Sequence, residues 1–217
     1  MSAKFRIIQF IFVSICSIVI GYQYFTDSDV VNADKLAATY TATAAPITAA
    51  NTPVDHGKLR ASIALQEYNK GVEESIKGCN CGPEIDKYTE GNAAQWCAMF
   101  ASWVTLQSGS PMTDRVTKSW RIANSRVFEK NLIDNGTYFT KSDISEKKIE
   151  PKLGDYVIFA RGGEDSGLGH IGIVVEYDAR TNEIGMISGN FKDKIAYHRG
   201  YEYMEHNGFL GIGRPEK

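Results

Sequence analysis

Apolar and polar residues alternate along this chain with two different periods. The first part of the folded region has a helical period, with apolar residues at Leu65, Tyr68, Val72 and Ile76. We expect Gly71 to end this first helix early, because glycine is common just beyond a helix C-terminus. The same period predicts a second helix from Gln95 to Gln107 and a third helix from Thr117 to Glu129.

Beyond Pro151 the pattern changes to that of strands. Short segments rich in β-branched and aromatic residues are separated there by Gly, Asp and Asn. The predicted strands are Tyr156–Ala160, Ile171–Tyr177, Ile184–Ser188, Ile195–Tyr197 and a last one at Phe209–Ile212. Helices followed by hairpin-connected strands predict an α+β domain, in which N-terminal helices pack on a C-terminal antiparallel sheet.

The N-terminal segment from Ile7 to Phe25 is mostly apolar and carries no charge. A helix needs about 20 such residues to cross the hydrocarbon core of a bilayer. Two cationic residues precede the segment and two aspartates follow it, which predicts that the chain after Phe25 lies outside the cytoplasm. We therefore expect a cytoplasmic stub and membrane anchor over residues 1–25. A signal peptide cleaved near residues 31–33 is the alternative, and both interpretations export the rest of the chain.

Residues 26–57 are expected to form a flexible linker. Between residues 37 and 52 the chain consists almost entirely of alanine and threonine, which offer little to bury. A weak alanine-rich helix is the alternative. The folded domain is then expected over residues 58–217.

Composition and charge narrow the classes of function. The formal net charge is −2 and the sequence pI is about 6.1, and no basic stripe with interleaved aromatic residues occurs, so we expect no nucleic-acid partner. A hydrophobic content of 43% is ordinary for a globular protein. Four cysteines are too few for a disulfide scaffold, so burial must hold the core together.

Cys97 and His170 are the residues most suited to chemistry. Cys97 lies at the start of the second predicted helix, where the helix terminus is expected to lower the thiol pKa and the free N–H groups can hold an oxyanion. His170 stands in a glycine-rich turn that leads into a strand, a rigid support for a catalytic imidazole. The alternatives are a buried structural cysteine and a surface histidine.

Asn190 ends the strand that follows the one carrying His170. If the two strands pair as a hairpin, the side chains of His170 and Asn190 lie near each other. The amide oxygen of Asn190 could then accept the imidazole N–H and fix the ring, as in a Cys-His-Asn arrangement. The alternative is an ordinary turn asparagine. The remaining histidines, His56, His198 and His206, have no motif around them and are expected on the surface.

These segments together resemble the CHAP family of cysteine, histidine-dependent amidohydrolases and peptidases. The similar segments are Gln95–Val104 for the nucleophile helix, Pro151–Phe159 for the strand before the histidine, Gly169–Val174 for the histidine strand and Ser188–Asn190 for the third-residue strand. The segments 71–74 and 211–215 are also similar to those of a bacterial branch of the family. The resemblance implies a papain-like fold that cleaves amide bonds, usually in peptidoglycan. We expect no cofactor and no metal. Many members carry a carboxylate where this chain has Ser188, and Asn190 is taken here as the third residue.

Cys79 and Cys81 stand one residue apart in a glycine-rich turn. In an exported protein they could pair with each other, stay free, or bridge to Cys97 and switch it off. A metal site with Cys97 and His170 is less favoured, because structural zinc sites usually place two to four residues between cysteines. We expect the two to pair or stay free, leaving Cys97 reduced.

The sequence as a whole predicts an exported, membrane-anchored cysteine amidohydrolase or endopeptidase. Cys97 would be the nucleophile, His170 the base and Asn190 the residue that orients the imidazole, with a peptide or amide bond of peptidoglycan as the substrate. Two alternatives remain open. They are a non-catalytic wall-binding or assembly protein with the same fold, and an acyl transferase.

Overall fold

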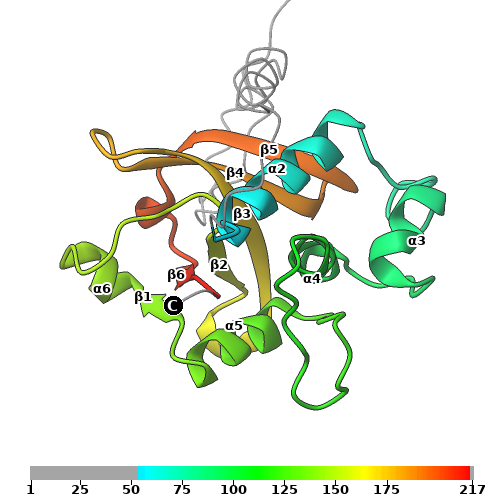
Figure 1. The fold of residues 1–217 in the computed structure, drawn as a ribbon. Coiled ribbons are helices and arrows are strands. Elements are labelled where there is room, and N and C mark those ends of the chain that lie inside the picture. The colour runs from blue at the N-terminus through cyan, green and yellow to red at the C-terminus, as the bar shows by residue number, and fades with distance from the viewer. Residues whose placement is uncertain (1–52, 216–217) are drawn as a thin grey trace, which may run out of the picture.

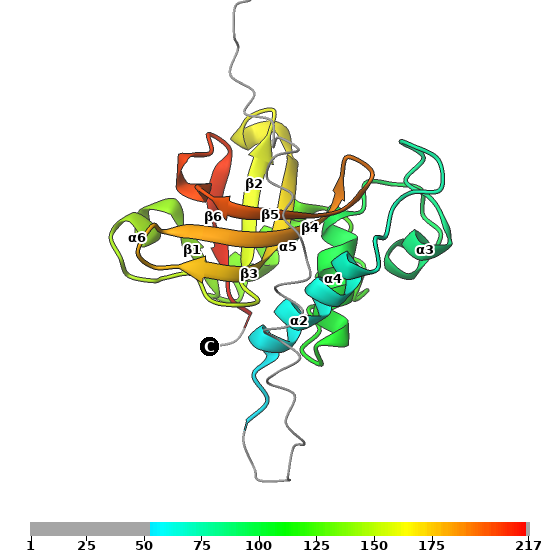
Figure 2. The same cartoon turned by 90° about the horizontal axis from the view of Figure 1, so that it is seen from above.

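The computed structural model describes residues 53–215 (Figures 1 and 2). The predicted anchor over residues 1–25 lies outside this range, as does the predicted linker up to residue 52. Within residues 53–215, no helix combines the length and the apolar character needed to cross a membrane.

Helices dominate the first half of the described chain. They are α2 (His56–Asn69), α3 (Pro83–Thr89), α4 (Cys97–Gln107), α5 (Ser125–Asp134) and α6 (Lys141–Ser145), with short 3₁₀ turns at Glu164–Ser166 and Tyr203–Glu205. Helix α2 begins two residues before the expected domain boundary. The side chain of Asp55 caps it by accepting the backbone N–H of Lys58 at 3.0 Å.

The strands form one antiparallel sheet, six-stranded over residues 53–215, in the order β1-β6-β2-β3-β4-β5. Their bounds are Tyr138–Thr140 for β1, Tyr156–Arg161 for β2, Leu168–Asp178 for β3, Glu183–Phe191 for β4, Lys194–Tyr201 for β5 and Phe209–Gly213 for β6. Every pairing is antiparallel. The predicted α+β class with an antiparallel sheet is confirmed.

Helices α2 and α4 lie side by side over the middle of the sheet, and α3 lies beyond α4 at the periphery (Figures 1 and 2). Helix α4 packs on β3 and β4, and α5 packs on β2 and β3. The main core fills this helix–sheet interface and includes Trp96, Phe100, Ile171 and Ile187, each at most 1% exposed. A second core lies around Phe159, so the sheet is buried on both faces.

The helix predictions are right for the first two helices and wrong for the third. Helix α2 ends before Gly71, which has φ of +67°, as expected. The third helix, predicted from Thr117, begins only at Ser125. The Asp114 carboxylate caps a single turn by accepting the backbone N–H groups of Val116 and Thr117, both at 2.8 Å. Lys118, with φ of +59°, ends this turn in the left-handed region, so the helix cannot continue from Thr117.

The five predicted strands all form, and each extends beyond its predicted bounds. Strand β3 begins at Leu168, so that His170 is already its third residue rather than part of the preceding turn. The short elements α3, β1 and α6 were not predicted, because three to seven residues are too few to display a period.

A close backbone contact docks α2 against the turn that leads into β2. Gly154 has φ of +81°, and a Cβ built there would lie 2.1 Å from the carbonyl oxygen of Gly57. Arg60 from the same helix donates its Nε–H to the Gly154 carbonyl oxygen at 2.9 Å. The contact therefore depends on an absent side chain at Gly154.

We predict that Gly154→Ala is much more destabilising than Gly136→Ala. Gly136 has a similar φ of +66° but open space around it, so its substitution carries only the backbone cost of about 1–2 kcal/mol. The clash with Gly57 adds roughly 1–3 kcal/mol at Gly154. Urea unfolding of the two variants measures the difference, and equal free energies of unfolding would contradict the proposed contact.

Candidate active site

Cys97 is the first residue of α4, which begins two residues later than predicted. Its thiol is free, and the residue is only 6% exposed because α4 packs its first turn against β3 and β4. Trp96 occupies the N-cap position without a capping side-chain bond. The N–H groups of this first turn are therefore available around the sulfur.

The environment of Cys97 opposes ionisation in the resting structure. Burial raises the pKa of the thiol above its usual value, although the charge of Arg161 and the backbone N–H groups of Ala98 and Ile171 favour the thiolate. The sequence argument that a helix N-terminus would lower this pKa is wrong in its net direction. The helix terminus contributes as expected, but the loss of water around the sulfur outweighs it.

His170 is a buried residue of β3, only 2% exposed. It lies opposite Phe159 in the β2–β3 pair, and its ring centroid is 6.4 Å from that of Phe191. Neither ring nitrogen has a hydrogen-bond partner among residues 53–215. Burial lowers the imidazole pKa well below its usual value, and the charges of nearby Arg161 and two other histidines act in the same direction.

The sulfur of Cys97 lies near the backbone of β3, at the residue directly after His170. The backbone N–H of Ile171, directly after His170 in the chain, lies where it stabilises the Cys97 thiolate. Because both nitrogens of His170 lack a partner, no hydrogen bond joins this ring to the sulfur. Both groups rest in their neutral forms. Buried imidazole nitrogens usually have hydrogen-bond partners. The two nitrogens of His170 have none among the described residues, so the neutral ring has a nitrogen available to accept a proton.

Asn190 lies near the end of β4, with φ of +53°. Strands β3 and β4 pair as the predicted hairpin, but their pairing ends at Ile173↔Ile187, before it reaches His170 and Asn190. The Asn190 side chain does not bond to the imidazole. Its Nδ2 donates instead to Oδ1 of Asn80, at 2.9 Å.

Ser188, at the position where many CHAP proteins carry a carboxylate, pairs with a second histidine. Its Oγ lies 3.2 Å from Nε2 of His198, and both residues are at most 2% exposed. The prediction that His198 lies on the surface is wrong, because β5 pairs with β4 and places it opposite Met186. The ring of Phe191 covers it edge-on at 4.6 Å between centroids.

The other two histidines are not fully on the surface either. His206 is half-buried, with its ring centroid 5.0 Å from that of Phe159. His56 is also half-buried, and its Nδ1 lies 2.7 Å from the carbonyl oxygen of Ser108. Each is held by tertiary contacts that a lone histidine in a sequence does not reveal.

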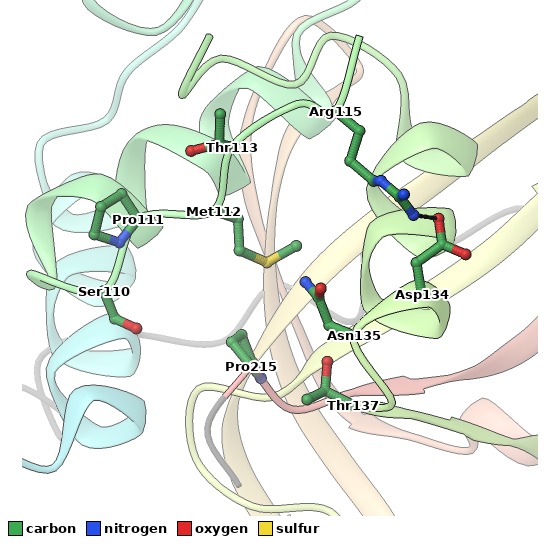
Figure 3. A pocket seen from close by; sticks show the side chains of 9 residues that line it. All are labelled: Ser110, Pro111, Met112, Thr113, Arg115, Asp134, Asn135, Thr137 and Pro215. Carbon is green, nitrogen blue, oxygen red and sulfur yellow. Dashed lines mark hydrogen bonds and ion pairs between the residues drawn. The ribbon is translucent and has the colours of Figure 1, made fainter. Parts of the chain in front are cut away.

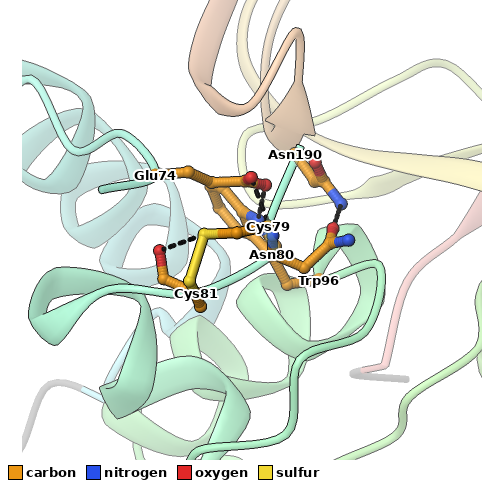
Figure 4. The surroundings of a disulfide bond; sticks show 6 residues. All are labelled: Glu74, Cys79, Asn80, Cys81, Trp96 and Asn190. Carbon is orange, nitrogen blue, oxygen red and sulfur yellow. Dashed lines mark hydrogen bonds between the residues drawn. A yellow bond between two sulfur atoms is a disulfide. The ribbon is translucent and has the colours of Figure 1, made fainter. Parts of the chain in front are cut away.

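Cys79 and Cys81 form a disulfide with each other (Figure 4). Of the two expected states, paired or free, the structure shows the pair, and the alternative in which one of them bridges to Cys97 is wrong. Within the described range 53–215, no three His, Cys, Asp or Glu side chains are grouped so that they could hold a metal ion.

A polar pocket of about 510 Å³ lies away from these residues (Figure 3). It is lined by the segment after α4, which carries Arg115, and by the end of α5, which carries Asp134. These two side chains form an ion pair. Cys97 begins α4, whereas the pocket lies beyond the other end, roughly 16 Å along the helix axis. The pocket is therefore not part of the candidate active site.

Sequence reasoning missed several residues around the site, namely Glu74, Asn80, Arg161 and His198. Asn80 had a local signal, since it stands between two cysteines, and Glu74 lay in one of the segments similar to the family. The others reach the site through strand pairing or through contacts between segments far apart in the chain.

The CHAP domain family model matches residues 88–190. The match covers the start of α4 and the strands that carry His170 and Asn190. No curated protein matches the chain.

We predict that His170 makes the stability of the protein depend on pH. Its folded pKa lies below the unfolded value of about 6.5, so its contribution is complete above that value and is lost as the pH falls further. The free energy of unfolding should therefore drop between pH 7.5 and pH 5, by at most about 1.4 kcal/mol per pH unit from this group. Urea titrations of wild type and His170→Leu measure it. An equally steep drop in the variant would assign the dependence to other groups.

Proposed function

This chain carries a CHAP-type domain, and we propose that the domain is a cysteine hydrolase that cleaves amide bonds in peptidoglycan. CHAP domains are generally amidases or peptidases. The observation that carries the proposal is a free cysteine at the start of α4 whose sulfur lies near the backbone N–H of Ile171, directly after a buried histidine whose two ring nitrogens have no partner among the described residues.

The proposed reaction is acyl transfer through a thioester. His170 takes the proton of the Cys97 thiol as the sulfur attacks the amide carbonyl. The imidazolium then returns the proton to the departing amine, and water releases the acyl group with His170 as the base. Backbone N–H groups at the start of α4, including that of Cys97, hold the developing oxyanion.

The resting structure requires a rearrangement before this reaction. Since no bond joins the imidazole to the sulfur, the side chain of His170 or of Cys97 must turn toward the other when substrate arrives. Arg161 assists the thiolate electrostatically but opposes the imidazolium. We propose that Asn190 completes the arrangement by accepting the second ring N–H of His170 in the engaged state.

Export and membrane attachment belong to the same proposal. The uncharged apolar run before residue 26 supports an anchor or a signal sequence. The Cys79–Cys81 disulfide supports an oxidising compartment, since such bonds rarely persist in the cytosol. A domain held outside the cytoplasmic membrane would meet peptidoglycan, the usual substrate of CHAP proteins.

One observation favours a non-catalytic wall-binding protein instead. Burial keeps Cys97 and His170 neutral and no bond joins them, as would suit a fold that has lost its chemistry. A thiol-reactive substrate analogue distinguishes the two, because covalent labelling of Cys97 requires a working nucleophile. Mass analysis of digested peptidoglycan identifies the bond that is cleaved and detects transfer to an amine in place of water.

We predict that Cys97→Ala abolishes peptidoglycan digestion by the full-length protein while leaving it folded. His170→Ala should cost about as much, because nucleophile and base act as a unit. Asn190→Ala should cost less, since it orients the ring and transfers no proton. Release of soluble fragments measures activity, and circular dichroism serves as the folding control. Near-wild-type activity in Cys97→Ala would reject the mechanism. A silent Asn190→Ala beside a severe Ser188→Ala would reassign the third residue.

A further inference from the structure

The side chain of Asn190 is held from outside its own sheet by the loop between the two paired cysteines. Its Nδ2 donates to Oδ1 of Asn80 at 2.9 Å, a contact between residues 110 positions apart in the chain (Figure 4). An asparagine amide can otherwise turn over and exchange its oxygen for its NH₂ group. The bond to Asn80 fixes the amide with the Asn190 oxygen as its remaining acceptor.

Asn80 is itself fixed on three sides. It has φ of +51° and stands between Cys79 and Cys81, whose disulfide closes the chain around it. Its backbone N–H donates to Oε2 of Glu74 at 2.8 Å. On the far side of the disulfide, the carbonyl oxygen of Cys81 accepts the backbone N–H of Ser75 at 3.0 Å. The acceptor on Asn80 therefore has little freedom to move.

Glu74 connects this loop to the start of α4. Its second oxygen, Oε1, accepts the indole N–H of Trp96 at 2.9 Å, and Trp96 is the N-cap residue directly before Cys97. Glu74 is 8% exposed and Trp96 is fully buried. The indole also lies against β4, since a Cβ built on Gly189 would stand 2.8 Å from Trp96 Cζ3.

The backbone of Glu74 and its neighbours is hydrogen-bonded to the sheet. The N–H of Glu74 donates to the carbonyl oxygen of Asp193 at 2.8 Å, and the carbonyl oxygen of Val72 accepts the N–H of Ile195 at 3.0 Å. These bonds tie the segment to the β4–β5 turn, directly after the strand that carries Asn190. Loop, helix start and strand end thus form one connected frame.

We propose that Asn80 and Glu74 are positioning residues for the reaction. Asn80 sets the direction of the Asn190 amide, and Glu74 holds both Asn80 and the N-cap residue of the nucleophile helix. The inference rests on the proposed function of Cys97, His170 and Asn190. It adds two residues that touch neither the substrate nor the reacting atoms, and it assigns the disulfide a local task, which is to hold Asn80.

The test uses two substitutions of Asn80 in the full-length protein. Asn80→Gly removes the acceptor and keeps the positive φ, whereas Asn80→Asp keeps an acceptor for Asn190. We expect Asn80→Gly to lower kcat on a soluble peptidoglycan fragment roughly ten- to hundredfold, with KM and the unfolding midpoint nearly unchanged. Asn80→Asp should restore most of the rate. An unchanged kcat in Asn80→Gly would overturn the proposal.

A double-mutant cycle tests whether Asn80 acts through Asn190. In the Asn190→Ala background, Asn80→Gly should cause no further loss of kcat, because its target is already gone. If the two substitutions lowered kcat additively, Asn80 would act independently of the Asn190 amide, and the positioning proposal would be wrong. Glu74→Gln should slow the reaction as well, since its NH₂ group cannot accept one of the two N–H donors.

A second measurement keeps this proposal separate from the proposed function. The side-chain NH₂ signal of Asn190 in NMR spectra should show a protected proton in wild type and in Asn80→Asp, and lose it in Asn80→Gly. If wild type cleaves no peptidoglycan but this signal behaves as expected, the proposed function fails while the contact stands. If wild type is active and the signal does not respond to Asn80→Gly, the positioning proposal fails alone.

Discussion

The burial of a reactive sulfur at a helix–sheet interface is the constraint on which the rest of this structure depends. Helix α4 begins against β3 and β4, so Cys97 is removed from water by the same packing that forms the core. Desolvation opposes the thiolate more strongly than the helix terminus and Arg161 favour it. His170, buried on β3, is subject to the same penalty as a cation. At rest the thiol and the imidazole are therefore both neutral, and the thiolate and imidazolium must form when substrate binds.

This constraint explains why many contacts around the site hold side chains and backbone groups in fixed positions. Charge that appears only during the reaction must be met by groups already in place, because a buried site cannot recruit water to respond. The frame of Glu74, Asn80 and Trp96 supplies such order on one side of the site. The contact of α2 with the turn before β2 also fixes the start of the strand that pairs with β3.

The sequence predicted the parts of this molecule that depend on local pattern. The strands were recognisable because β-branched and aromatic residues cluster in them, and Cys97 and His170 because their flanking residues resemble a known family. The third helix was misplaced because Lys118 adopts a left-handed backbone conformation, which ends the single turn that Asp114 caps. The raised pKa of Cys97, the burial of His198 and the bond between Asn80 and Asn190 could not be predicted. Each arises from packing between segments distant in the chain.

The disulfide encloses only one intervening residue, and this has a consequence for how the protein can vary. A cross-link over so short a loop removes little conformational entropy from the unfolded chain, so it contributes less to overall stability than one that closes a long loop. Loss of this cysteine pair is therefore expected to change the free energy of unfolding only slightly. What would change is the fraction of molecules in which Asn80 is held in position to bond to Asn190. Catalytic competence could therefore vary without a change in the stability of the core.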